Sequence, residues 1–416
     1  MTWLNILNCT IGILFSVCYL YQYVYIVIAF VKKPKRFNET EKRYRYAVLV
    51  SARNERAVIG QLCDSIRGQD YPAELIDVHV IADNCTDDTA AIAARHGAIV
   101  HVRNDRAHVG KGYALKFVFD EIGRDYGLDY YDGYFVIDAD NLLEPDYISE
   151  MNKAFAAGHR VVTSYRNSKN YGDNWISSGY SLWFLREARE LNAVRFQLKT
   201  SCVVAGTGFL IHKDVVKELG GWKYFLMTED TEFTVERMIA GEKIAYCHDA
   251  VFYDEQPTRF SQSWRQRKRW AKGYFQVLGR YGGKMIKAIF RGNFSCFDMF
   301  MSLSPAFFLS LLLVFVNLGA AVYAAFAAPT LLLPILWGVL HTALNAYALL
   351  FIVALTTVIL EWKRIRATTA KKILSVFTLP IFIATYVPIS ISAIFTKVEW
   401  KPIEHSVAVS VEELKK

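Results

Sequence analysis

Three long stretches without a charged side chain dominate this sequence. Residues 1–31, 299–360 and 373–396 contain no Asp, Glu, Lys or Arg, although charged residues make up 21% of the 416-residue chain. A helix that crosses a bilayer needs about 20 apolar residues, and the middle stretch can hold two, divided near Ala328-Pro329. The sequence therefore predicts an integral membrane protein and excludes an ordinary soluble domain, a disordered chain and a disulfide scaffold.

The positive charge lies beside these stretches. The formal net charge is +8, yet residues 32–45, 258–291 and 361–372 carry +5, +10 and +4, which leaves the rest of the chain at −11. Basic clusters next to apolar helices are typical of the cytoplasmic side of a membrane and of contact with anionic lipid. We expect a lipid bilayer, and no nucleic acid, as the partner of this charge.

The first stretch lacks a basic start and an A-x-A cleavage site, so an uncleaved anchor with its N-terminus outside is predicted. Residues 373–396 fit one span or a re-entrant hairpin. We expect a multi-pass protein of the plasma membrane with a cytoplasmic catalytic domain. The predicted parts are an anchor at 1–31, a soluble domain at 45–257, interfacial helices at 258–298, a membrane region at 299–397 and a tail at 398–416.

The cysteines form no metal-binding or disulfide pattern. Their number is odd and no CxxC pair occurs, which argues against structural zinc and iron–sulfur clusters. Reduced thiols in a cytoplasmic domain fit this spacing. The positions are Cys9, Cys18, Cys63, Cys85, Cys202, Cys247 and Cys296.

Between the first two apolar stretches, strand-like runs alternate with helical patterns. Such alternation predicts an α/β domain with a largely parallel sheet. Ligands of such sheets bind at the carboxyl ends of the strands, which is where the polar motifs of this chain lie. The predicted strands are 46–51, 76–83, 98–102 and 133–138, and the predicted helices are 56–69, 86–95 and 110–122.

Two carboxylates, Asp138 and Asp140, follow the strand 133–138. On an extended segment, residues i and i+2 point the same way, so both face one site. Mg²⁺ or Mn²⁺ is typically held by one or two carboxylates and substrate phosphates. Taken alone, an ordinary acidic turn explains D-x-D as well.

The first two strands also end in polar runs. SARNE (51–55) follows the first strand, and DNCTDDT (83–89) ends the second. Asp, Asn and Thr are natural helix caps, and Thr86 or Asp87 is predicted to cap the next helix. A base and a ribose would supply partners for these groups, with Asp83 facing the site.

Two loops contain paired glycines. Gly110-Lys111-Gly112 permits close approach of a ligand, and Lys111 suits a diphosphate; the Walker spacing is absent. Gly206-Thr207-Gly208 precedes an apolar strand, where close ligand approach and a plain turn fit equally.

Two further motifs lie on predicted helices. Thr228-Glu229-Asp230 starts the stretch 231–240, where acids favour the helix dipole and a carboxylate can also act as a general base. Gln266, Arg269 and Trp270 form Q-x-x-R-W, on one helix face. Arginine suits a diphosphate and an indole suits a sugar ring, whereas the flanking Arg265, Arg267 and Lys268 are predicted to be lipid-facing interfacial bases.

As an ordered set, these motifs resemble those of the family 2 membrane glycosyltransferases, which include hyaluronan, chitin, cellulose and poly-N-acetylglucosamine synthases. The resemblance covers residues 45–275. It implies a nucleotide-diphospho-sugar transferase fold with a mixed, mostly parallel sheet and α-helical membrane segments. The tail segment Trp400 to His405 also looks like a common ending of such synthases, and Glu255 with Pro257 lies in a run that leads into Q-x-x-R-W.

The resemblance implies a role for each matching position. The nucleotide-binding residues would be Ala52, Arg53, Glu55, Asp83, Lys111, Asp138 and Arg269. Asp140, together with Asp138, would ligate Mg²⁺ or Mn²⁺, and Asp230 would be the catalytic base. The acceptor-binding residues would be Gly206, Thr207, Gly208, Glu229, Gln266 and Trp270.

The implied reaction is inverting transfer from a UDP-sugar, UDP-glucose or UDP-N-acetylglucosamine, to a growing β-linked polysaccharide. A glycosyltransferase that adds one sugar to a lipid carrier is the alternative, although it would usually lack Q-x-x-R-W. A non-enzymatic partner would have lost a carboxylate at 140 or 230. The chain has fewer apolar spans than a cellulose-synthase-like channel, so a homodimer, an accessory export partner or the absence of translocation each fits.

Overall fold

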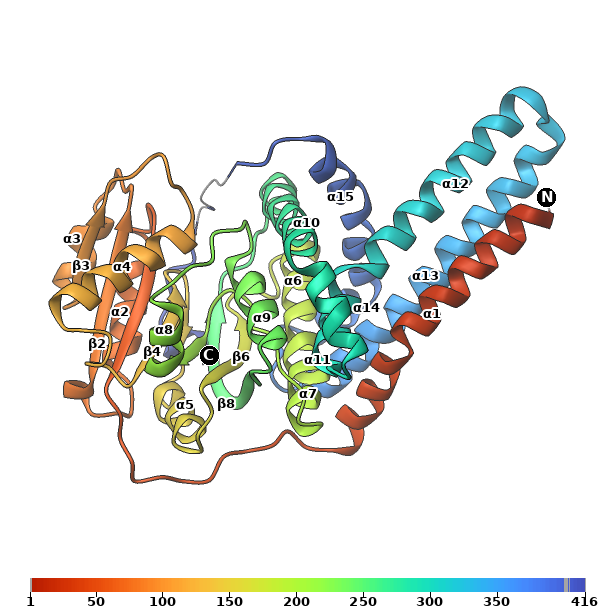
Figure 1. Ribbon diagram of the computed structural model, residues 1–416. Coiled ribbons are helices and arrows are strands. Elements are labelled where there is room, and N and C mark those ends of the chain that lie inside the picture. The colour runs from red at the N-terminus through yellow and green to blue at the C-terminus, as the bar shows by residue number, and fades with distance from the viewer. Residues whose placement is uncertain (1, 400–402, 404, 416) are drawn as a thin grey trace.

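The computed structural model describes residues 2–399, 403 and 405–415. A sheet of eight strands, in the order β3-β2-β1-β4-β7-β6-β8-β5, forms the core of the soluble part (Figure 1). The pairs β1–β2, β1–β4, β2–β3 and β6–β8 are parallel, and the other pairs are antiparallel. The strands are β1 Tyr46–Ala52, β2 Ile76–Asp83, β3 Ile99–Arg103, β4 Gly133–Asp138, β5 Leu142–Leu143, β6 Val161–Ser168, β7 Phe209–His212 and β8 Ala245–Asp254. The α/β prediction with a mixed, mostly parallel sheet is confirmed.

Helices cover this sheet and connect it to the apolar part of the chain. The helices up to residue 239 are α1 Thr2–Val31, α2 Ile59–Arg67, η1 Ala73–Leu75, α3 Thr89–Arg95, α4 Lys111–Asp125, α5 Tyr147–Ala156, α6 Trp175–Arg186, η2 Glu187–Asn192, α7 Ala193–Gln197, α8 Lys213–Leu219 and α9 Glu229–Ile239. Those after it are α10 Phe260–Phe290, α11 Phe294–Leu303, α12 Pro305–Ala327, η3 Pro329–Leu331, α13 Leu332–Glu361, α14 Thr369–Ala384, α15 Tyr386–Phe395 and α16 Val411–Lys415.

Four helix starts differ from the sequence prediction. Helix α2 begins at Ile59 and not at 56, and α4 begins at Lys111 and not at 110. The helix expected from residue 86 begins at Thr89, whose N–H is accepted by Asp87 Oδ1 at 3.1 Å, while the N–H of Thr86 bonds to Asn54 instead. Helix α9 begins at Glu229 and not at 231, so the two carboxylates of the T-E-D motif lie inside its first turn.

The apolar helices project from the sheet domain as a long arm. In Figure 1, α1, α12 and α13 lie side by side, with the N-terminus at the far end of the arm and the C-terminus against the sheet. Large apolar side chains remain exposed along the arm, as a lipid-facing surface requires; Phe326 is 87% exposed. Within the described residues, four segments are long and apolar enough to cross a membrane: 4–31, 294–327, 329–361 and 369–395.

A buried polar cluster joins the arm to the soluble part. Arg195 of α7 donates to both carboxylate oxygens of Asp298 of α11 at 2.8 Å. The hydroxyls of Tyr21 and Tyr25 of α1 donate to the same carboxylate at 2.9 and 3.0 Å. Four side chains from three separate segments are thereby satisfied together, which fixes how the first apolar helix meets the interfacial helices.

All seven cysteines are free thiols. Block 373–396, left open between a span and a re-entrant hairpin, forms α14 and α15 with a break at Thr385, and the two helices together make one candidate span. The expected division of 299–360 near Ala328-Pro329 is confirmed.

Candidate functional site

The carboxyl ends of the parallel strands meet at one edge of the sheet. Ala52 of β1 lies opposite Ala82 of β2, and Ser51 lies opposite Asp138 of β4. These registers bring the polar runs after β1, β2 and β4 together, as the predicted topology requires.

Asp83 is buried at the end of β2 and is bound by an arginine. Its Oδ1 accepts hydrogen bonds from Arg103 Nη1 at 2.6 Å and from Asn84 at 2.9 Å. Burial raises the pKa of Asp83, while the charges of Arg103 and Arg53 oppose that rise. Arg103 therefore belongs to the polar groups around Asp83, and the sequence analysis did not predict it.

Lys111 connects the D-x-D motif with the glycine loop 206–208. Its ammonium group is paired with the Asp138 carboxylate and donates to the Gly206 carbonyl at 2.8 Å. The N–H of Asp138 donates to Thr207 Oγ1 at 2.9 Å. Lys111 and Asp138, both predicted to meet the nucleotide sugar, therefore lie in contact, together with two residues of the predicted acceptor loop.

Asp140 points toward a different set of groups. Its Oδ2 accepts the N–H of Glu255 at 2.9 Å, and His405 Nε2 lies 3.9 Å from the same oxygen. Burial disfavours the ionised form, but His405, Lys169 and Arg166 hold the pKa of Asp140 below its usual value.

His405 belongs to the C-terminal tail, which returns to the strand ends. Its Nδ1 donates to Glu55 at 2.9 Å, and the Glu255 carboxylate accepts the N–H groups of Ser406 and Val407. Burial lowers the pKa of His405, yet the Asp140 and Glu55 carboxylates raise it to about 10. No role was predicted for His405; its place in the tail motif was the only signal. Residues 400–402 and 404 of that motif lie outside the described residues.

The surroundings of Asp140 fit a divalent cation. In the described part of the chain, no group of three or more His, Cys, Asp or Glu side chains is arranged as a metal cage. Mg²⁺ and Mn²⁺ sites completed by substrate phosphates need only one or two carboxylates. The carboxylates of Glu55 and Asp140 raise the pKa of His405, so the local charge favours a cation. A divalent cation bound here would take the place of the imidazole proton. A His ring whose Nδ1 is held by a carboxylate is also the common second-shell arrangement of metal-binding histidines.

The carboxylates of Glu229 and Asp230 lie on the other side of loop 206–208. A Cβ at Gly206 would lie 3.8 Å from Asp230 Oδ2, so the loop passes close to this carboxylate, and the φ of +82° at Gly206 favours glycine. Burial and the charge of Asp230 raise the pKa of Glu229 to about 7. Burial also raises the pKa of Asp230, against the charges of Lys111 and Arg269. A carboxylate with a raised pKa is suited to take a proton near neutral pH.

The Q-x-x-R-W residues lie on α10, which packs tightly against the start of α9. A Cβ on Gly273 would meet Thr228 at 2.5 Å, so only glycine allows this contact. Arg269 lies near enough to lower the pKa of both Glu229 and Asp230. The Trp270 ring packs edge-on against Tyr180 and Phe184, at centroid distances of 5.7 and 6.2 Å.

The prediction for Arg267 is wrong. It is fully buried and donates to the Phe382 carbonyl at 3.0 Å and to Thr385 at 2.7 Å. Its guanidinium also lies 4.3 Å from the Phe382 ring centroid. Arg267 faces inward because α14 and α15 pack over this face of α10.

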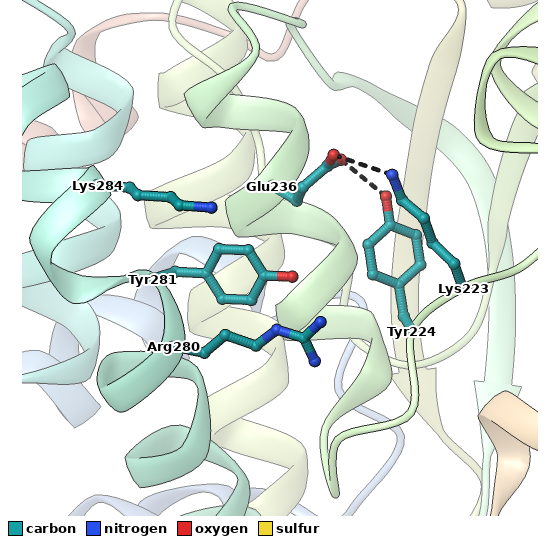
Figure 2. A pocket seen from close by; sticks show the side chains of 6 residues that line it. All are labelled: Lys223, Tyr224, Glu236, Arg280, Tyr281 and Lys284. Carbon is teal, nitrogen blue, oxygen red and sulfur yellow. Dashed lines mark hydrogen bonds and ion pairs between the residues drawn. The ribbon is translucent and has the colours of Figure 1, made fainter.

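A separate pocket of about 240 Å³ lies between α9 and α10 (Figure 2). Glu236 accepts from Lys223 at 3.3 Å and from the Tyr224 hydroxyl at 2.7 Å. Arg280 and Tyr281 bind the buried Glu232 at 3.2 and 3.0 Å. These polar groups bond to one another and hold the two helices together beside the T-E-D motif.

The profile of the glycosyltransferase-like family 2 matches residues 43–273, which is more than half of the chain and includes the strand-end runs, both glycine loops, T-E-D and Q-x-x-R-W, but not the tail motif. The chain belongs to this family. Its sheet domain has the GT-A-type nucleotide-sugar transferase fold.

Two of the relatives are named after different products, a glucolipid and a polysaccharide. The chain is 24% identical to a probable glycosyltransferase, YdaM, of Bacillus subtilis over 61% of this chain and 61% of that protein. It is 25% identical to a β-monoglucosyldiacylglycerol synthase of Synechocystis over 55% of this chain and 47% of that protein. It is 22% identical to a poly-β-1,6-N-acetyl-D-glucosamine synthase of Staphylococcus epidermidis over 63% of this chain and 64% of that protein. The chain thus spans about half to two thirds of the length of these relatives.

A solved structure extends the likeness in fold to the apolar helices. The mannosyltransferase PcManGT of Pyrobaculum calidifontis, in complex with GDP-Man and Mn²⁺, is similar with a TM-score of 0.63 at 16% identity, over 94% of this chain and 99% of that one. At this identity the likeness concerns the fold alone.

Proposed function

We propose that this glycosyltransferase is a membrane-bound, inverting enzyme that transfers glucose or N-acetylglucosamine from its UDP derivative to a growing β-linked polysaccharide. The observation that carries this proposal is the position of Arg269 beside the Glu229–Asp230 pair, with Trp270 as the next residue of the same helix, α10. An aromatic ring on the helix that approaches the base suits a sugar acceptor whose hydroxyl must lose a proton.

The reaction follows from the placement of these groups. The acceptor hydroxyl attacks the anomeric carbon, its proton passes to Asp230, and the bond from that carbon to the UDP oxygen breaks. Arg269 and Lys111 offset the charge on the departing diphosphate. A single displacement of this kind turns an α-linked donor into a β-glycoside.

A divalent cation bound at Asp140, with His405 and Asp138 near it, would neutralise diphosphate charge. Asp83, Ala52, Arg53 and Glu55 form the wall for the nucleoside. These residues bind and orient the donor, and such positioning accounts for a large part of enzymatic rate enhancement.

A second function is a glycosyltransferase that adds one sugar to a lipid. The observation that favours it is the arm of α1, α12 and α13, whose outward side chains are apolar and which offers a lipid acceptor a path to the interfacial helices. The match to a glucolipid synthase supports the same reading.

One assay separates the two functions. Membranes containing the protein are given a panel of radiolabelled UDP-sugars with Mg²⁺ or Mn²⁺, and the products are divided by organic extraction and sized. A long water-soluble β-glycan from one UDP-sugar supports the polysaccharide synthase. Label confined to the lipid extract as a single sugar supports the lipid transferase, and the absence of UDP release from every donor contradicts both.

A further inference from the structure

A small cavity lies directly behind the predicted acceptor loop. Its walls come from the sheet, from loop 205–208 and from the helix pair α6–η2, and they include Arg166, Phe184, Glu187, Ala205 and Thr207. The space accessible to a water centre is about 20 Å³, which is room for one water or one hydroxyl group.

Glu187 is the first residue of η2, a six-residue π-helical segment inserted between α6 and α7. Such insertions widen a helix locally and are frequent at functional sites. The neighbouring carboxylate of the same segment, Glu190, accepts hydrogen bonds from Thr356 and Thr357 of α13 at 3.0 Å. Glu187 faces the cavity instead.

The Glu187 carboxylate has no hydrogen bond and no ion pair with any residue of the described chain, although burial and the charge of Asp230 raise its pKa. Arg166, the nearest cation among the cavity walls, is already used. It bonds to Asp254 at 2.6 Å and to the Ala205 carbonyl at 3.1 Å, and its guanidinium stacks 3.6 Å from the Phe184 ring centroid. Glu187 is half-buried, and a partly desolvated carboxylate without a protein donor favours a partner that donates, so a ligand hydroxyl or N–H would be suitable.

The cavity adjoins both parts of the acceptor site. Ala205 and Thr207 flank Gly206, which lies close to Asp230. Phe184, on the opposite wall, is in edge contact with Trp270. The Tyr274 hydroxyl lies near enough to Asp230 and to Glu187 for both carboxylates to raise its pKa. An acceptor that stacks on Trp270 and presents one hydroxyl to Asp230 is thus within reach of Glu187 with a second polar group.

We propose that Glu187 is a specificity-determining residue that accepts a hydrogen bond from a second hydroxyl or amide N–H of the acceptor sugar. This inference rests on the proposed function, because it assigns a partner in the acceptor site of that reaction. A site that hydrogen-bonds a substrate hydroxyl strongly rejects an analogue without that hydroxyl. A site that only leaves room for the hydroxyl rejects the analogue weakly.

The test uses the full-length protein in membranes and octyl β-glycosides of glucose and N-acetylglucosamine as acceptors. For each, a series of analogues lacks one polar group of the ring. We expect one analogue to lose at least tenfold in kcat/KM with the natural enzyme. In Glu187→Ala and Glu187→Gln, that discrimination should shrink to about threefold or less.

The matched control is Glu190→Gln, which changes a carboxylate of the same π-helical segment that points at α13. It should keep the full discrimination. If the Glu187 variants discriminate as the natural enzyme does, or if the natural enzyme treats all analogues alike, the carboxylate holds only a water and the inference is overturned. The failure of every UDP-sugar to release UDP overturns the proposed function, and the assignment with it.

Discussion

His405 Nδ1 lies 2.9 Å from Glu55 Oε2, although 350 positions separate the two residues. This contact closes the C-terminal tail over the strand ends, and the other imidazole nitrogen faces Asp140. Two further contacts hold the tail against the sheet domain. Lys169 donates to the Val407 carbonyl, and Val411 packs with Leu142 and Tyr253. The tail is therefore a wall of the proposed donor site.

The tail contact predicts a change in the metal requirement. We expect His405→Ala to weaken the apparent affinity for Mn²⁺ by about tenfold, because groups that surround a metal site affect binding by about 10- to 100-fold. The measurement is UDP release against Mn²⁺ concentration at saturating UDP-sugar. His108→Ala, an exposed histidine outside the tail, is the control; identical Mn²⁺ curves for His405→Ala and the natural enzyme would contradict the prediction.

Asp230→Asn should abolish transfer and preserve donor binding. The amide cannot take the acceptor proton, and loss of a general base lowers rates by about 10²- to 10⁴-fold. Calorimetry with UDP and Mn²⁺ should give an unchanged affinity, while product formation falls at least 100-fold. Full activity in this variant would show that another group accepts the proton.

The raised pKa values of the carboxylate pair predict an acid limit of activity. Asp230 must be ionised to act, and its burial raises its pKa, so kcat/KM should fall as the pH drops through the range where the pair takes up a proton. Glu229→Gln removes the neighbouring negative charge, which lowers the pKa of Asp230 and should move the acid limb to lower pH. The pH profile of initial rates measures both, and a limb that moves to higher pH in Glu229→Gln would contradict the assignment.

The sequence was sufficient for the parallel strands β1 to β4 and for most of the residues that line the candidate site, but not for β5, β6 and β8. Strand 76–83 was predicted with its bounds, and 133–138 likewise, because buried parallel strands are continuous apolar runs bounded by polar turns. The positions of Asp83, Asp138 and Asp230 at strand or helix ends follow from the same patterns. Their chemical roles remain predictions.

What the sequence could not predict depends on contacts between distant segments. His405 contacts Glu55 because residues 405–415, which follow the last apolar helix in sequence, lie against the strand ends and β5 and β8. Glu187 lies in an ordinary helical run, and nothing in its neighbours indicates a π-helical insertion or a cavity. The positive charge of Arg267 led to the wrong prediction that it faces lipid. The pattern of residues along α10 does not reveal which face of the helix α14 and α15 will cover.

Trp270→Ala should spare donor binding and reduce transfer to sugar acceptors. The ring lies against Tyr180 and Phe184, so its removal takes away a platform and leaves the strand-end site intact. Product sizing should show shorter chains, and UDP affinity should stay within about twofold. Trp264→Ala, on the same helix but packed on Phe260, is the matched control; unchanged chain length in Trp270→Ala would contradict the stacking role.

Arg267→Ala should destabilise the protein, whereas Arg265→Ala and Lys268→Ala on the same helix should not. The Arg267 guanidinium ties α10 to α14 and α15, and its removal leaves the Phe382 carbonyl without that donor and a cavity beside three aromatic rings. Loss of a buried hydrogen-bonded group costs about 1–3 kcal/mol, and the cavity adds to this cost. Thermal unfolding in detergent, followed by tryptophan fluorescence, measures the difference. Equal midpoints for Arg267→Ala and Lys268→Ala would mean that the inward position of Arg267 contributes nothing to holding the helices together.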